Sequence, residues 1–391
     1  MKGGKLLAEG GYGCVFLPGM NCKGELLTTQ KYVSKIQKFD NSARNEIEIG
    51  KLIQKIPNYS NYFSPIIKYC SIDIASIKDE DVDKCTILKK KKTKDFITMK
   101  ILHISGDDFI DYTKNNMNGA QILGNLIASY QYLLKAIAML IKKKIIHYDL
   151  KGTNILFETT KQIPIIIDFG LSIQVSKINK NNLKDFFYVY APEYYVWPLE
   201  VHYLNLIANK IKNPSKKMLK ELANDYVMNN KGLTKNYSPQ FLKEFEKKCY
   251  SQLIYYNDLP YEERLEKLLN YWTTFDNYSL SIMYLKFLSY INMDGYSNNS
   301  FVIFLSQLCL QNIDPNPENR LTIAETIQTF KLFLHNKNIN NVKTFEDFIK
   351  GFVNKREKIS EELVLDSKEV STLHKKIIKL KKKTSKRYSS V

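Results

Sequence analysis

Short runs of alternating apolar and polar positions open the chain and predict a small β-sheet. Residues 5–38 read as strands broken by a glycine cluster and a turn, and Lys31 to Ile36 alternates as a short strand does. Apolar positions then recur at helical spacing from Ser42 to Ile56, and Pro57 ends that pattern. The strand pattern returns at 64–104. We therefore expect a sheet with one helix after its third strand.

Helical patterns dominate the remainder of the chain. Gln121 to Lys144 reads as a long amphipathic helix, and short strands are predicted at 145–157 and 163–169. Helical periodicity then continues from about 200 to 350. Residues 375–391 hold eight Lys or Arg and no acid, which is typical of a mobile basic tail. The patterns predict an α+β chain, with a small β-rich part before a larger helical part.

The composition is that of a globular protein, with 44% hydrophobic, 12% aromatic and 25% charged residues. A chain of 391 residues exceeds one ordinary core, so one large bilobal unit or two to three domains are expected. Apolar runs fall short of the roughly 18–20 residues that cross a bilayer, and residues 1–13 lack the apolar stretch of a secretory signal. We therefore expect no transmembrane segment.

The chain is strongly basic, with 58 Lys and Arg against 40 Asp and Glu and a formal net charge of +18. Such a charge concentrates acidic partners, namely nucleic acid, anionic lipid or acidic protein. Abundant Ile, Lys, Asn and Tyr, which AT-rich codons encode, offer a second explanation through genome composition. Both explanations stay open.

Six cysteines stand at positions 14, 22, 70, 85, 249 and 309. They show neither the density of a disulfide scaffold nor the paired spacing of metal ligands. We therefore expect a reducing, intracellular compartment and no structural zinc.

A glycine-rich segment lies between two of the predicted strands. Residues 8–15 read Ala-Glu-Gly-Gly-Tyr-Gly-Cys-Val, and glycines let backbone amides approach an anion closely. A flap over phosphates and a plain hairpin both agree with these residues alone.

Two later motifs favour the phosphate interpretation. Residues 147–156 read His-Tyr-Asp-Leu-Lys-Gly-Thr-Asn-Ile-Leu, which places Asp149, Lys151 and Asn154 at offsets 0, 2 and 5 in one loop. Fourteen residues after Asn154, a predicted strand ends in Asp168, followed by Phe and Gly. A carboxylate is thereby held at a strand end beside a flexible glycine.

This ordered set resembles the signature of the eukaryotic-type protein kinases. The strand lysine of that family corresponds to Lys35 and its helix glutamate to Glu46. Glu48 is the other candidate for this glutamate. We favour Glu46, because it places the following isoleucines at core-facing offsets of the helix.

The resemblance continues through the second part of the chain and spans about residues 5–335. The family's Ala-Pro-Glu segment stands at 191–193. Asp276 resembles the Asp that opens the central helix of the larger lobe. Arg320 resembles the Arg that pairs with the Glu of the Ala-Pro-Glu segment.

The resemblance implies an α+β, bilobal protein-kinase-like fold. It places a small β-rich N-lobe with the glycine-rich loop at 1–106 and a larger helical C-lobe with the catalytic loop at 107–340. Residues 194–275 exceed the usual short connection of the family, so we expect a helical insertion at about 200–270 beside the substrate groove. A C-terminal extension with the basic tail follows at 341–391.

The implied function is that of a serine/threonine protein kinase, which transfers the γ-phosphate of ATP to protein hydroxyl groups with Mg²⁺. Catalysis of this reaction is mostly positioning and charge neutralisation. The resemblance implies that Lys35, oriented by Glu46, holds the α- and β-phosphates. Asp149 would accept the proton of the substrate hydroxyl, and Lys151 would neutralise the γ-phosphate. A lysine at that offset resembles the serine/threonine branch.

The same resemblance implies the metal and nucleotide sites. Asn154 and Asp168 supply the hard oxygen ligands that Mg²⁺ prefers. The expected nucleotide-binding residues are Ala8, Gly10, Gly11, Gly13, Val15, Val33, Lys35, Ile101, Asp108 and Leu156. Of these, Val15, Val33 and Leu156 would enclose the adenine, Ile101 would begin the hinge, and Asp108 would lie near the ribose.

Four positions depart from the family pattern, and the first, Ala8 in place of the first loop glycine, is expected to be tolerated because Gly10 and Gly13 remain. Tyr148 stands where many kinases carry an Arg that reads activation-loop phosphate, so that form of control is not expected. Gly50 replaces a bulky residue that packs the helix against Phe169, which predicts a less firmly held active arrangement. Phe186 stands where serine/threonine kinases usually have a Thr, which leaves the acceptor open.

Two alternatives remain beside the kinase interpretation: a pseudokinase scaffold, and a kinase-fold enzyme with a non-protein acceptor. The expected partners are ATP and protein substrates, including acidic ones, with weak binding of nucleic acid or anionic surfaces through the basic tail. The insertion and the Asn-, Ile- and Lys-rich composition are similar to kinases encoded by large cytoplasmic DNA viruses. That similarity implies a cytoplasmic location, in the host cytoplasm or the virion.

Overall fold

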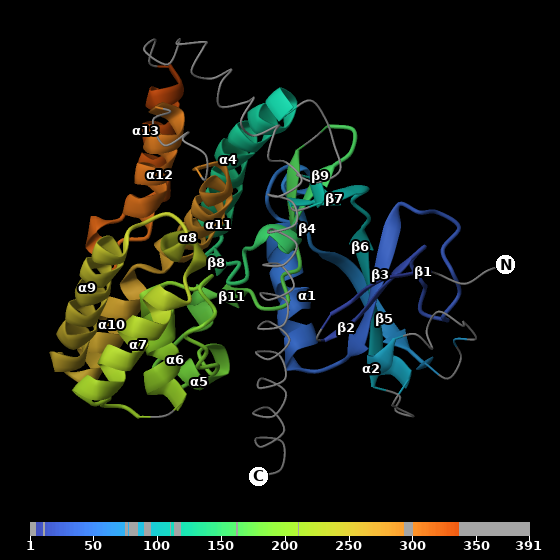
Figure 1. Cartoon of the computed structure of the whole chain (residues 1–391). Helices are drawn as coiled ribbons and strands as arrows, with labels where there is room; N and C mark the ends of the chain where they lie inside the picture. Colours follow the sequence, from blue (N-terminus) through green and yellow to red (C-terminus); the bar gives the residue numbers. More distant parts are fainter. Residues whose placement is uncertain are drawn as a thin grey trace.

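The computed structural model describes residues 5–335, apart from 11, 75–76, 78–84, 90–94, 110, 113–118, 162, 210 and 293–299. A sheet-rich N-terminal part and a larger helical C-terminal part lie on either side of helix α1 (Asn41–Ile53) (Figure 1). The predicted α+β, bilobal arrangement is therefore confirmed. The predicted basic tail and the extension at 341–391 lie outside the described residues.

A five-stranded antiparallel sheet forms the first part, with strand order β1-β2-β3-β6-β5. Its strands are β1 (Lys5–Glu9), β2 (Gly13–Leu17), β3 (Tyr32–Lys38), β5 (Ile66–Ile72) and β6 (Phe96–Leu102). One face has a small core of its own, which contains Cys14, Phe16, Met20, Ile36 and Phe96. The short helix α2 (Thr86–Lys89) lies against β2 at this core.

Helix α1 packs on the opposite face of this sheet. Asp40 caps its start by accepting a hydrogen bond from the Ala43 amide at 3.0 Å. Ala43 and Ile47 share a buried cluster with Ile97 and Met99 of β6. This packing fixes which side of α1 faces the sheet.

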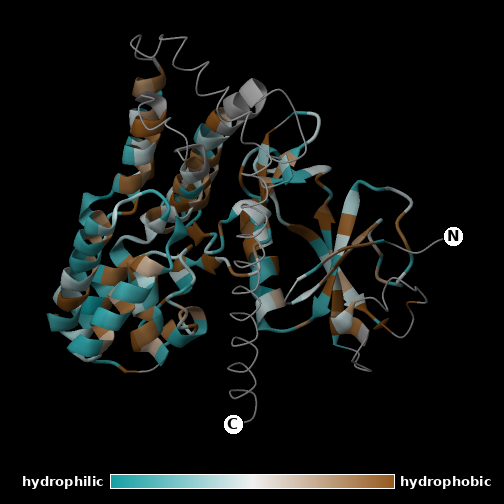
Figure 2. Cartoon of the chain, viewed as in Figure 1, coloured by the Kyte–Doolittle hydropathy of each residue, from teal (hydrophilic) through white to brown (hydrophobic). Residues whose placement is uncertain are grey.

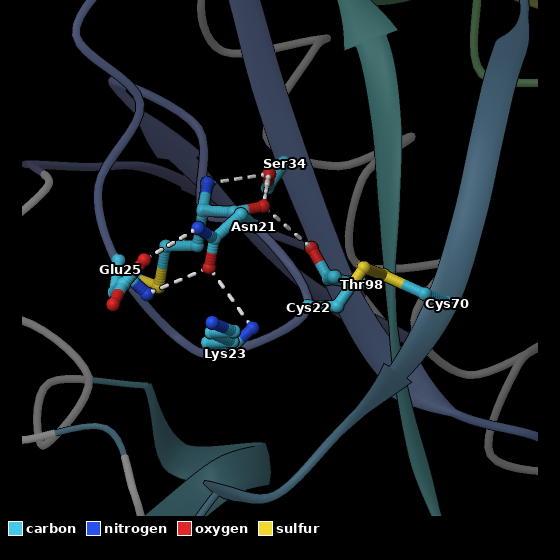
Figure 3. Close-up of a disulfide and its surroundings, with 8 residues drawn as sticks. Asn21, Cys22, Lys23, Glu25, Ser34, Cys70 and Thr98 are labelled. Carbon is cyan, nitrogen blue, oxygen red and sulfur yellow. Dashed lines mark hydrogen bonds between the residues drawn. A yellow bond between two sulfur atoms is a disulfide. The ribbon is translucent and has the colours of Figure 1, made fainter.

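Two disulfides cross-link the first part of the chain, Cys14–Cys85 and Cys22–Cys70. Figure 3 shows the second, which joins the turn after β2 to β5; the side chain of Asn21 braces that turn by accepting the Lys23 and Glu25 amides at 2.9 and 3.0 Å. The expectation drawn from the cysteine spacing is therefore wrong. The partners are 71 and 48 residues apart, so only the folded sheet brings them together. Because disulfides are rare in reducing compartments, the argument for such a compartment loses its basis.

Two smaller sheets lie between the five-stranded sheet and the helices. One has the order β4-β10-β9-β7, and the other pairs β8 with β11. Their strands are β4 (Phe63–Ser64), β7 (Gly106–Asp108), β8 (Ile145–Ile146), β9 (Ile155–Glu158), β10 (Pro164–Ile167) and β11 (Ile173–Gln174). The motif that contains Asp149 follows β8, and Asp168 follows β10, so these short strands position both carboxylates.

Helices build the second part. They are α4 (Gly119–Lys142), α5 (Leu183–Phe186), α6 (Leu199–Asn209), α7 (Lys216–Met228), α8 (Lys231–Thr234), α9 (Pro239–Asp258), α10 (Tyr261–Asn270), α11 (Phe275–Asn292), α12 (Ser300–Asn312) and α13 (Ile323–His335). Helix α6 is buried along almost its whole length, whereas α9 buries one face and shows mixed hydropathy in Figure 2. Within the described ranges, no helix is long and apolar enough to cross a membrane.

Candidate active site

One face of the five-stranded sheet carries five residues that the sequence assigns to nucleotide binding. Strand register pairs Ala8 with Val15, Val15 with Lys35, and Val33 with Ile101. Cross-strand partners share a face, and so do positions two apart on one strand. These five side chains therefore lie on the face against which α1 packs.

The glycine-rich loop joins β1 to β2 beside this face. The Gly10 amide donates to the Gly13 carbonyl at 2.9 Å, which closes a tight turn. Gly13 has no room for a side chain, because a carbon there would lie 2.3 Å from the Ile36 carbonyl oxygen. Gly11 lies outside the described residues.

Asp108 and Leu156 lie opposite one another on the paired strands β7 and β9. The close approach of these strands requires Gly106, since a side-chain carbon there would lie 1.8 Å from the Phe157 carbonyl oxygen. Strand β6 ends at Leu102, one residue after Ile101, and residues 103–105 lead to β7, so the predicted hinge lies at the connection between the two larger sheets.

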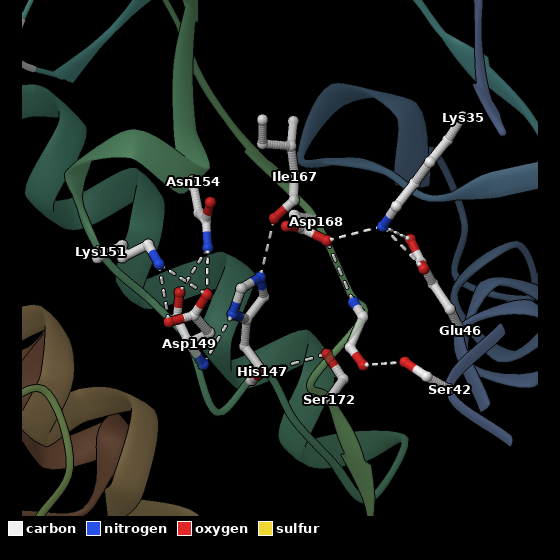
Figure 4. A network of polar contacts seen from close by, with 11 residues as sticks. Lys35, Ser42, Glu46, His147, Asp149, Lys151, Asn154, Ile167, Asp168 and Ser172 are labelled. Atoms are coloured by element: carbon white, nitrogen blue, oxygen red, sulfur yellow. Dashed lines mark hydrogen bonds and ion pairs between the residues drawn. The ribbon is translucent and has the colours of Figure 1, made fainter. Parts of the chain in front are cut away.

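A buried lysine connects α1 to the second part of the chain. Lys35 Nζ lies 2.9 Å from both carboxylate oxygens of Glu46 and 3.2 Å from Asp168 Oδ1 (Figure 4). Burial disfavours the charge of Lys35, but Asp168 and Glu46 outweigh it and raise the pKa of the ammonium. Burial raises the pKa of Glu46, and Lys35 opposes this effect. Glu48, the rival partner, pairs instead with Lys177.

Three polar side chains converge in the loop after β8. Lys151 Nζ lies 3.2 and 3.0 Å from the two carboxylate oxygens of Asp149 (Figure 4). Asn154 Nδ2 donates to the Asp149 carbonyl oxygen at 2.8 Å and to Asp149 Oδ2 at 2.9 Å. Both bonds use the amide nitrogen of Asn154, so its side-chain oxygen is the atom suited to a cation.

The backbone of this loop is held from the helical part. Asp276, at the start of α11, accepts hydrogen bonds from the amides of His147 at 2.7 Å and Tyr148 at 3.1 Å. The His147 ring contacts the Ile167 carbonyl oxygen at 3.0 Å and packs edge-on against Phe169 with ring centroids 5.0 Å apart. His147 therefore packs and forms hydrogen bonds within this loop.

Two backbone conformations in the site are unfavourable by themselves. Tyr148 and Asp168 have φ angles of 68° and 59°, in the left-handed region. Such residues cost about 1–3 kcal/mol each and persist where the surrounding structure holds them. Phe169 supplies part of that hold, since its ring also packs against Phe63 at 6.1 Å.

Two expectations for this region need correction. Arg320 bonds to Glu200 at 2.9 and 3.0 Å, and not to Glu193, because the fold buries Glu200 at the start of α6 while Glu193 stays partly exposed. Phe186 lies in the short helix α5, and the residue that reaches the Asp149 carboxylate is Tyr194.

The second correction concerns Gly50. It does not loosen α1, because the absent side chain allows the helix to approach β5: a carbon there would lie 2.7 Å from the Ile66 carbonyl oxygen. The side-chain amide of Gln54 donates a hydrogen bond to that same carbonyl oxygen at 3.0 Å. The Lys35–Glu46 contact is formed with Gly50 in place.

Sequence reasoning missed two tyrosines of the site. Tyr194 is fully buried and its hydroxyl donates to Asp149 Oδ1. Tyr12, inside the glycine-rich loop, is 8% exposed. Burial is the main cause that raises its pKa, and the charges of Asp168 and Asp149 add to it. The chain has 26 tyrosines, so the sequence alone does not distinguish the two that reach the site. The one local indication is that Tyr12 stands between two glycines of the loop.

A nucleotide with Mg²⁺ suits these residues. Lys35 brings a positive charge to the face of the sheet beside the glycine-rich loop, where it could meet phosphate oxygens. Asn154 and Asp168 both offer oxygen atoms, which Mg²⁺ prefers to nitrogen or sulfur.

Comparison with known proteins agrees with this geometry. The family described as protein kinase domain matches residues 2–204, just over half of the chain. Mitogen-activated protein kinase kinase kinase 8 of Rattus norvegicus is 43% identical over 47 residues, which is 12% of this chain and 10% of that protein. The match thus spans about a tenth of the length of this relative.

Proposed function

Since this chain belongs to the protein kinase family, we propose that it is an active serine/threonine protein kinase that uses ATP and Mg²⁺. The observation that carries the proposal is the contact of Lys35 with Glu46 at 2.9 Å and with Asp168 at 3.2 Å, which joins the sheet, α1 and the metal-binding segment. A pseudokinase scaffold is the alternative, and it would be expected to lack one of these groups.

The residues divide the work as phosphoryl transfer requires. ATP with Mg²⁺ supplies the phosphoryl group and neutralises part of its charge. Lys35 holds the α- and β-phosphates, and Glu46 keeps its ammonium in place. Asp149 receives the proton of the acceptor hydroxyl, while Lys151, within 3.2 Å of that carboxylate, places a positive charge beside the transferred group.

The test is transfer of labelled γ-phosphate from ATP with Mg²⁺ to the protein itself and to basic and acidic model proteins. Wild type is compared with Asp149→Asn and Asp168→Asn, and phosphoamino acids are then identified. Phosphoserine or phosphothreonine that disappears in both variants supports the proposal. Measurable ATP binding without transfer contradicts it and favours a scaffold. Transfer that yields only phosphotyrosine refutes the serine/threonine assignment.

Part of the helical insertion at about 200–270 is proposed to recognise the protein substrate. The whole insertion comprises α6 to α10. Buried Arg264 stabilises the insertion by donating hydrogen bonds to the carbonyl oxygens of Lys212 at 2.7 Å and Leu259 at 2.9 Å. Limited proteolysis within 205–265 that leaves protein-substrate turnover intact counts against this role. Turnover of a small molecule or lipid, with proteins left unmodified, would point to a non-protein acceptor.

We further propose that the N-lobe spans residues 1–106 and the C-lobe residues 107–340, and that a basic extension follows at 341–391. We also propose that the protein is of viral origin and acts in the cytoplasm. The two disulfides count against a strongly reducing compartment. We propose that the basic tail binds nucleic acid or anionic surfaces weakly, with steep salt dependence. A chain that ends near Glu369 and keeps its affinity for DNA or RNA would refute the nucleic-acid role.

A further inference from the structure

The Asp149 carboxylate is held from two different segments of the chain. Lys151 and Asn154 contact its Oδ2 atom at 3.0 and 2.9 Å, and both belong to the same loop as Asp149. Such partners move with the loop, so they do not fix the carboxylate relative to the walls of the site. The hydroxyl of Tyr194 donates to Oδ1 from a segment 45 residues further along the chain.

The segment that carries Tyr194 is itself well anchored. The Trp197 indole donates to the Tyr148 carbonyl oxygen at 2.7 Å, and Ser279 of α11 donates to the Val196 carbonyl oxygen at 2.7 Å. The Tyr194 ring packs edge-on against Trp197 with centroids 4.9 Å apart. The hydroxyl therefore reaches Asp149 from a fixed support.

The Tyr194 hydroxyl acts as a neutral donor. Its side chain is 1% exposed, and burial together with the neighbouring Asp149 raises its pKa well above the ordinary value. A hydroxyl that donates to a carboxylate forms a short, charge-assisted hydrogen bond. Such a bond restricts rotation of the carboxylate.

From these contacts we propose that Tyr194 is a positioning residue for Asp149. Its hydroxyl holds Oδ1, and this fixes the orientation in which the carboxylate receives the proton of the acceptor hydroxyl. The inference rests on the proposed kinase function and deepens it. At the position where the resemblance leads one to expect a Thr, this chain has Phe186, which cannot donate a hydrogen bond.

The test is Tyr194→Phe, which removes the hydroxyl and keeps the ring. We expect kcat for protein phosphorylation to fall about tenfold or more, with the KM and Kd for ATP and the thermal midpoint unchanged. Tyr284→Phe is the matched control, because it removes another buried tyrosine hydroxyl, which contacts Ser129 Oγ at 2.7 Å and lies in α11, outside the proposed substrate-recognition insertion. This control should leave kcat unchanged.

Each other result has a definite meaning. Unchanged kcat in Tyr194→Phe overturns the inference, and increased kcat overturns it by showing that the hydroxyl obstructs the acceptor. A parallel loss of ATP affinity or thermal stability assigns Tyr194 a purely structural role. If wild-type protein transfers phosphate and Asp149→Asn does not, any of these results refutes Tyr194 alone. Inactive wild-type protein refutes the proposed function, and this inference with it.

Discussion

At the scale of single residues, a buried ion pair joins Arg320 to Glu200 in the helical part. Both side chains are fully shielded from solvent, and the two guanidinium nitrogens lie 2.9 and 3.0 Å from the carboxylate oxygens. Removing one partner of a buried pair leaves the other charge uncompensated, which typically costs about 3–5 kcal/mol.

We therefore expect Glu200→Gln to lower the free energy of unfolding by about 3–5 kcal/mol in urea titrations. Glu193→Gln is the matched control, because Glu193 is the partner that the sequence motif suggested and it is only partly buried. Its effect should stay within about 1 kcal/mol. Equal losses in the two variants would contradict the assignment of Glu200 as the partner.

His202 makes the fold sensitive to acid. It is fully buried in α6, and burial lowers its pKa from 6.5 to about 4, although nearby carbonyl groups and Glu193 oppose the shift. In the unfolded chain the imidazole binds a proton below about pH 6.5, whereas in the folded chain it does so only below about pH 4. Stability is therefore lost as the pH falls through this window.

The expected loss between pH 7 and pH 5 from His202 alone is about 2 kcal/mol in the free energy of unfolding. Urea titrations at the two pH values measure it. The glutamine in His202→Gln does not titrate. The variant should therefore lose about 2 kcal/mol less than wild type in the free energy of unfolding between pH 7 and pH 5. An identical pH dependence in the two proteins would exclude His202 as the acid-sensitive group.

At the scale of elements, the close contact of α1 with β5 holds Glu46 against the sheet. Gly50→Ala would place a carbon 2.7 Å from the Ile66 carbonyl oxygen. Overpacking of this kind costs about 1–3 kcal/mol and outweighs the helix preference of Ala over Gly, which is about 1 kcal/mol or less. We expect lower stability and a higher KM for ATP, because α1 must shift and take Glu46 with it.

Thermal unfolding and steady-state kinetics measure both effects of Gly50→Ala. Lys51→Ala is the control, since it changes the next, exposed position of α1. A more stable Gly50→Ala protein with unchanged KM would show that α1 has room to move.

The disulfide between Cys22 and Cys70 joins the turn after β2 to the edge strand β5. It closes a loop with a sequence separation of 48 residues, which corresponds to about 2–4 kcal/mol of stabilisation. The double substitution of both cysteines by serine should lower the free energy of unfolding by that amount. Mass spectrometry after alkylation counts the blocked thiols. Unchanged stability would mean that the bond is absent in solution.

At the scale of the whole molecule, local patterns predicted the architecture because they report local structure. Alternation and helical spacing indicated the sheet and α1, and short motifs indicated Asp149 and Asp168, since each lies beside a strand that its own neighbours define. The fold brings both carboxylates to the side of the sheet where Lys35 lies.

Contacts between distant segments were not predictable in this way. Arg320 and Glu200 are 120 residues apart, and Cys14 and Cys85 are 71 apart. No periodic pattern records such pairs, because they arise only when separate elements pack together. Tyr194 belongs to the same class of contact, since its hydroxyl meets Asp149, which lies 45 residues earlier in the chain.

The burial of one disulfide also dictates when it must form. Cys14 in β2 and Cys85, directly before α2, are completely shielded from solvent, whereas Cys22 lies at the surface. Thiol–disulfide exchange requires that an attacking thiolate reach the sulfur atoms. The inner bond can therefore form or be reduced only while this part of the sheet is open, whereas the exposed Cys22 leaves the outer bond within reach of a thiolate in the folded protein.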